Sequence, residues 1–89
     1  MSHEIVLVTW KDAQDSDGTW TDIEDIINHE LSTCQEVGWL IHKDREKIIV
    51  MRSRIVESDT DEIKEGGAYI AIPNTWVVSL QRLDIIDEI

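Results

Sequence analysis

Five short runs of mainly apolar residues, most of them rich in β-branched side chains, divide this 89-residue chain and constrain its fold more than any other feature. Each run has the length of one strand, and polar or Gly- and Pro-containing segments separate the runs. The strands are predicted at residues 5–10, 34–43, 47–56, 68–72 and 76–83. Pro73 ends the fourth strand because it has no N–H to donate to a ladder. Five short strands without an internal repeat predict a mainly β fold, a small antiparallel barrel.

One helix is predicted between the first two strands, at about residues 22–30. Thr21 suits the N-cap, and Glu24, three residues later, completes a capping box. A helix this short is marginal on its own, so we expect its apolar face to dock on the rest of the protein. The residues with helical spacing on that face are Ile23, Ile26, Ile27 and Leu31.

Charge and composition narrow the classes of function. Eight basic residues against 19 acidic ones give a net charge of −11. This excludes binding of duplex DNA through a broad basic face, and it disfavours an anionic membrane surface. One cysteine and three histidines without metal-ligand spacing predict no disulfide, no metal site and no cofactor. With no apolar run of membrane-spanning length and no leader pattern, we expect one cytoplasmic domain over residues 1–89, ending in an acidic tail at 84–89.

Two segments resemble the motifs of Sm and Sm-like proteins. Gly38-x-Leu40-x-x-x-Asp44 matches their first motif, a glycine in the second strand and an aspartate in the turn before the third. Residues 72–78, Ile-Pro-Asn-Thr-Trp-Val-Val, occupy the place of the second motif. The resemblance covers about residues 34–83, and the helix after the first strand is similar to that of short Sm-like proteins of phage origin.

The resemblance implies a strongly bent, SH3-like five-stranded barrel that assembles with copies of itself into a ring. In this family the fourth strand of one subunit pairs with the fifth strand of the next, which satisfies unpaired N–H and C=O groups at the sheet edges. The resemblance therefore implies a homo-oligomeric binding or scaffold protein, encoded by a phage and acting in the host cytoplasm. The predicted interface residues are Ala68, Tyr69, Ile70, Ile72, Trp76, Val78 and Leu80.

RNA binding at the ring face is the alternative function. Asp44 is in place, but Ile48 stands where the family has an asparagine, and Pro73-Asn74 stands where it has Arg-Gly. Isoleucine and proline side chains offer no hydrogen bonds to a base. In the other interpretation, Asp44 only holds the turn, and the basic residues of the 43–54 hairpin pair with the acidic loop at 59–65, on the same or a neighbouring subunit. The candidate RNA contacts are Asp44, Lys43, Arg45, Lys47, Arg52 and Arg54.

An acidic segment at residues 13–24 nearly matches a calcium-binding loop, which makes metal binding a weaker alternative. Asp15, Asp17, Gly18 and Glu24 fit that pattern, but Ala13 holds the position of the first ligand. A solvated loop leading into a helix is therefore the favoured interpretation.

Catalysis is not expected. Cys34 could pair with His29 or His42 as nucleophile and base, yet no group that would stabilise a developing charge is recognisable. We predict that Cys34 is a buried structural thiol. The four tryptophans are predicted to pack in the core or at interfaces, and they are Trp10, Trp20, Trp39 and Trp76.

Overall fold

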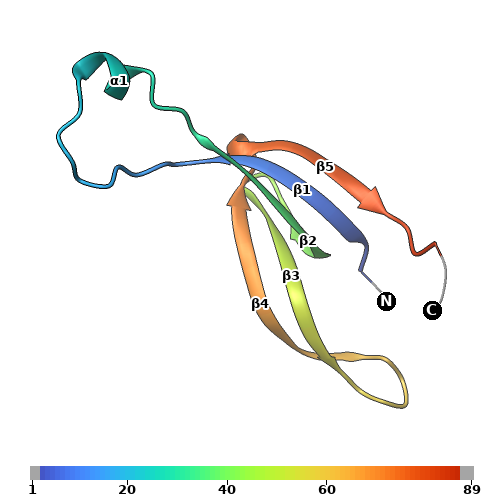
Figure 1. The fold of residues 1–89 in the computed structure, drawn as a ribbon. Helices are drawn as coiled ribbons and strands as arrows, with labels where there is room; N and C mark the ends of the chain where they lie inside the picture. The colour runs from blue at the N-terminus through green and yellow to red at the C-terminus, as the bar shows by residue number, and fades with distance from the viewer. Residues whose placement is uncertain (1–2, 87–89) are drawn as a thin grey trace.

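A computed structural model describes residues 3–86 and shows a mainly β protein (Figure 1). Its strands are β1 (Ile5–Asp12), β2 (Ser32–Lys43), β3 (Lys47–Val56), β4 (Ile63–Pro73) and β5 (Val77–Leu83). A helix α1 (Ile23–Ile27) lies between β1 and β2, and a 3-10 turn η1 (Asn74–Trp76) connects β4 to β5. The five predicted strands are confirmed. β4 begins at Ile63, earlier than predicted, so the charged loop before it is shorter.

The five strands form one open antiparallel sheet in the order β4-β3-β2-β1-β5. β2 pairs with β1 from Ser32 to Trp39 and with β3 only from Trp39 onward, so the sheet divides along this strand. The β3–β4 hairpin consequently diverges from β1 and β2 (Figure 1). The predicted mainly β, antiparallel fold is present, but within residues 3–86 the sheet does not close into a barrel, because β4 and β5 are edges that do not pair with each other.

The core lies on one face of the sheet, where side chains alternate inward along each strand. It consists of Val6, Val8, Trp10, Ile48, Val50 and Ile72. Cys34, Leu40, Ile70, Val77 and Leu80 are partly buried and pack against these residues. Cys34 therefore packs against the core as predicted, but its side chain is half-buried rather than fully buried.

The predicted helix is shorter than expected and docks on nothing in the described chain. α1 covers residues 23–27 rather than 22–30, and none of its residues is buried. Asp22 is the N-cap and makes no side-chain capping bond, while Thr21 Oγ1 donates to the Thr19 carbonyl at 3.3 Å. The predicted capping box is wrong, because Asp22 rather than Thr21 is the N-cap and no side-chain capping bond forms. The predicted docking of the helix is also wrong, because every residue of α1 is exposed.

The segment at residues 13–31, which we call the arm, carries α1 away from the sheet (Figure 1). The molecule measures 60 × 33 × 23 Å, with a radius of gyration of 17.5 Å. A compact chain of this length would have a radius of gyration of about 12 Å. The arm and the diverging β3–β4 hairpin account for this extended shape.

Candidate functional site

The two segments that resemble Sm motifs meet at one end of the sheet. The Asn74 side-chain Nδ2 donates to the Asp44 carbonyl at 2.7 Å, and the Asn74 backbone N–H donates to the Glu46 carbonyl at 2.9 Å. Pro73 lies opposite Lys47 in the β3–β4 register. We call this surface, residues 43–47 and 71–76, the loop end.

Asp44 organises the turn within the loop end. Its Oδ1 accepts the backbone N–H groups of Glu46 at 2.8 Å and Lys47 at 2.9 Å. Its Oδ2 lies 2.8 Å from His42 Nε2 and 3.4 Å from Lys47 Nζ. The hydrogen bond with His42, followed by the backbone bonds, holds the pKa of Asp44 well below its ordinary value of 3.8. Both carboxylate oxygens are thus engaged inside the turn, which favours the interpretation that Asp44 holds it.

The predicted basic contacts divide into two groups. Lys43 and Arg45 are exposed at the loop end and form no ion pair with any residue between 3 and 86, whereas Lys47 binds Asp44. Arg52 and Arg54 lie farther along β3, past its pairing with β2. Two separate positively charged groups result, and only the first lies beside the turn between β2 and β3.

Arg52 and Arg54 on β3 both contact residues of β2, beyond the point where the two strands pair. Arg52 Nε donates to Glu36 Oε1 at 2.5 Å, and the Arg54 guanidinium lies 4.2 Å from the centre of the Trp39 ring. Such a cation–π contact contributes about 0.5–1 kcal/mol at a partly exposed site. Within the described chain, Arg52 and Arg54 therefore find their partners on β2 rather than on the 59–65 loop, and pairing with that loop of a neighbouring subunit stays a prediction.

The predicted oligomer interface lies on the two edges of the sheet. Tyr69 on β4 is 67% exposed and Val78 on β5 is 60% exposed, and Ala68 and Trp76 are exposed too. Ile72 is a core residue, so its side chain is unavailable to a partner. The side chains of Ile70 and Leu80 also pack against the core. These last three positions can offer a neighbouring strand mainly their backbone groups.

Sequence reasoning missed a second apolar surface on the face opposite the core. Five residues, one from each strand, lie opposite one another in a row across the sheet. They are Leu83, Ile5, Trp39, Met51 and Tyr69. Beside it a groove of about 420 Å³ is lined chiefly by Ile41, Ile49, Met51, Ile63 and Tyr69. The signal was present in the sequence, since β2 and β3 carry apolar residues at both odd and even positions, unlike a strand with one solvated face.

The acidic segment does not form a metal site in the described structure. Asp17 Oδ1 accepts a hydrogen bond from the Thr19 hydroxyl at 2.7 Å and another from the Thr19 backbone N–H at 3.0 Å. These two bonds lower the pKa of Asp17. Asp15 Oδ1 accepts the N–H of Ser16 at 2.9 Å. From residue 3 to residue 86, no three His, Cys, Asp or Glu side chains gather closely enough to hold a metal ion.

The remaining candidates are separated from one another. Cys34 lies opposite Trp10 in the β1–β2 register, while His42 binds Asp44 in the β2–β3 turn. Trp10 alone among the tryptophans is a core residue. Trp39 stacks under Arg54, Trp76 is partly exposed, and Trp20 on the arm is fully exposed. Core packing is therefore confirmed for Trp10, and packing of the other three rings at an interface stays a prediction.

Comparison with known proteins gives no assignment: no family model, no curated protein and no solved structure matches this chain. Over the described residues, no helix has the length and apolar character needed to span a lipid bilayer. We therefore infer a function from three features of the structure: the loop end, the sheet edges and the arm.

Proposed function

We propose that this chain is a non-enzymatic, Sm-like binding or scaffold protein whose sheet is completed by copies of itself in a ring. The observation that supports this most directly is that β4 and β5 both end the sheet in the described chain. An unpaired edge strand offers a row of N–H and C=O groups to another chain. Because the two edges differ, a head-to-tail contact between them can repeat and close into a ring.

The residues on these edges fit such a contact. Tyr69 and Val78 expose apolar side chains beside the unpaired backbone. The core is small, with six residues in its main cluster. A domain of about this size buries only about 60% of its unfolded surface and is correspondingly marginal. Edge pairing in a ring would add buried apolar area that the single chain lacks.

Native mass tests this proposal. Size-exclusion chromatography with light scattering, over a wide concentration series, should give an integral multiple of 10.3 kDa that exceeds the dimer. A mass of 10.3 kDa at every concentration would overturn the ring.

RNA binding at the loop end is a second candidate, which the exposure of Lys43 and Arg45 favours. In a ring, these two cations recur at each subunit beside the Sm-like turn. Fluorescently labelled oligouridine, titrated at low salt where screening is weakest, should bind wild type more tightly than either Lys43→Gln or Arg45→Gln. Lys64→Gln on β4 is the charge control. Absence of binding at low salt would remove this candidate without affecting the ring.

A further inference from the structure

The arm carries an unpartnered apolar surface. Every residue from 13 to 31 is exposed, and the large apolar residues among them are Trp20, Ile23, Ile26, Ile27 and Leu31. Several large apolar residues left exposed on one short segment indicate an interaction site. A five-residue helix also lacks the length to be stable in water without packing against another surface. The arm therefore needs an occupant for its apolar face.

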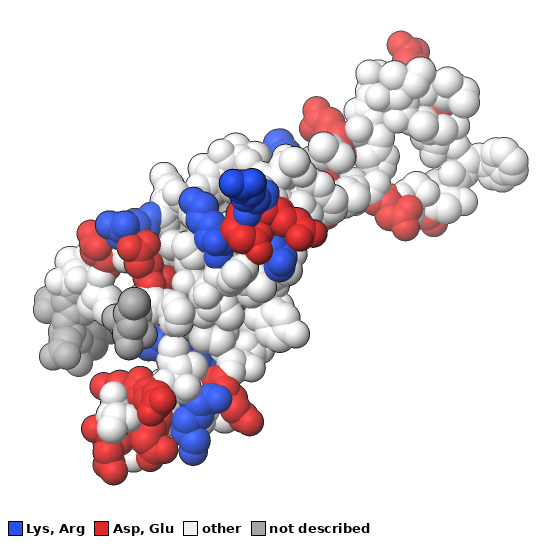
Figure 2. Space-filling model, turned by 180° about the vertical axis from the view of Figure 1, so that it is seen from behind, with Lys and Arg blue, Asp and Glu red and all other residues white. Residues whose placement is uncertain are grey.

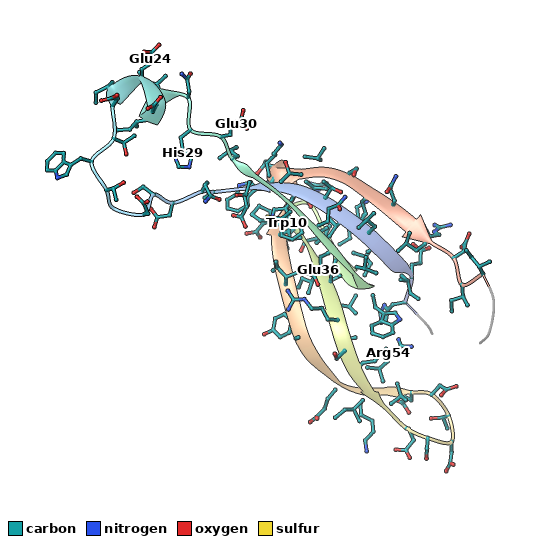
Figure 3. The ribbon with its side chains drawn as sticks, in the orientation of Figure 1. Trp10, Glu24, His29, Glu30, Glu36 and Arg54 are labelled. Carbon is teal, nitrogen blue, oxygen red and sulfur yellow. The ribbon has the colours of Figure 1, made fainter. Side chains whose placement is uncertain are left out.

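The charge of the arm limits what that occupant can be. Six acidic residues and no lysine or arginine lie between residues 13 and 31. Figure 2 shows acidic side chains over the arm, while lysines and arginines gather over the body of the sheet. Glu24 lies on the helix at the far end of the arm, and Glu30 lies nearer the start of β2 (Figure 3). An acidic, apolar segment fits a surface that combines basic and apolar groups.

The loop end of this same chain has that composition. Lys43 and Arg45 are exposed there without ion pairs in the described structure, and Ala71, Pro73 and Trp76 are exposed beside them. The β3–β4 loop at 57–62 is unsuitable by comparison, because it carries four acidic residues and would repel the arm.

Within one chain, the arm points away from the sheet rather than across the loop end (Figure 1). Its base nevertheless starts beside the loop end, since Ala13 and Leu31 share a hollow of about 230 Å³ with Thr75 and Trp76. Rotation about one ring axis places the same end of every subunit at the same level. The arm of one copy thus leaves its sheet at the level of the loop end of the next copy.

We propose that the arm of each copy lies on the loop end of a neighbouring copy, with its carboxylates facing Lys43 and Arg45 and its isoleucines against Trp76 and Pro73. This inference rests on the proposed self-assembly and names a second contact within it. The partner is another molecule of this chain, and the contact is distinct from the β4–β5 edge pairing.

A charge-reversal and rescue experiment tests this contact. Arg45→Glu should raise the concentration at which half the protein is assembled by about fivefold or more, as loss of a good surface ion pair would. Adding Asp25→Lys on the arm should restore assembly toward the wild-type value. Adding Asp59→Lys in the 57–62 loop restores the same net charge of −11 at a site away from the arm, and it should not restore assembly. Light scattering and sedimentation provide the readout.

A matched pair of variants tests the apolar part of the contact. Ile27→Ser on the arm should weaken assembly, whereas Ile86→Ser should not, although these isoleucines are 76% and 97% exposed in the single chain. Far-UV circular dichroism verifies that each variant is folded.

The outcomes separate the two proposals. A monomeric wild type would overturn both of them. A wild-type oligomer that Arg45→Glu and Ile27→Ser leave unchanged would overturn the arm contact alone, and so would equal rescue by Asp25→Lys and Asp59→Lys.

Discussion

Gly38 on β2 leaves no room for a side chain against β3. A Cβ at this position would lie 2.5 Å from the Met51 carbonyl oxygen and 2.8 Å from Val50 Cγ1. Gly38→Ala should therefore lower the free energy of unfolding by about 1–3 kcal/mol, the usual cost of overpacking. Urea denaturation would measure this. Gly67→Ala is the control, because its Cβ would meet Ser53 Cβ at an ordinary 3.5 Å, and an equal loss in both variants would contradict the prediction.

Asp44 predicts a pH dependence of stability. Its pKa in the folded protein lies below the ordinary 3.8, so its ionised form stabilises the fold. This contribution is fully present above the unfolded pKa and is lost as the pH falls toward the folded pKa. Urea denaturation should thus show that the stability difference between wild type and Asp44→Asn shrinks as the pH is lowered below about 4. Asp59→Asn, at an exposed position in the 57–62 loop, is the control, and an identical pH trend in both variants would contradict the assignment.

At the scale of the elements, the bulge in β5 offers a selective test of edge pairing. Val78 has no Cα partner on β1, since Thr9 lies opposite Ser79 and Trp10 opposite Val77. Proline is tolerated at bulges and edges, where no internal ladder bond is lost. Val78→Pro should therefore keep the far-UV circular dichroism of the sheet but lower the assembled mass in light scattering. Val78→Ala keeps the backbone N–H group, so it should assemble more fully than Val78→Pro. Assembly of Val78→Pro equal to that of Val78→Ala would contradict edge pairing through β5.

The elements also show where sequence patterns suffice. Each strand was predictable because its β-branched run and its bounding turn residues are local signals. The helix was predicted too long because helical spacing shows which residues share a face. It does not show whether another surface covers that face. Asn28 ends α1 after five residues, and Ile23, Ile26 and Ile27 stay exposed.

At the scale of the whole molecule, the arm is separable from the sheet. No arm residue belongs to the core cluster, and Asp12 lies directly opposite Ser32 in the β1–β2 register. Replacing residues 13–31 by Asn-Gly should connect these strands by a two-residue hairpin turn. The shorter connection costs about 2 kcal/mol less chain entropy to close. We expect retained strand content by circular dichroism and a reduced assembled mass, while loss of the sheet would show that the arm is part of the folding unit.

The sequence by itself determined the five strands, the end of β4 at Pro73 and the turn around Asp44, because each depends on residues that are neighbours in the chain. It also contains two segments, residues 38–44 and residues 72–78, that resemble Sm motifs. The tertiary structure decided that these motifs touch through Asn74, that the sheet stays open at β4 and β5, and that the arm stands away from it. These features depend on which distant segments pair and which surfaces are left uncovered, and no local pattern of side chains encodes that balance.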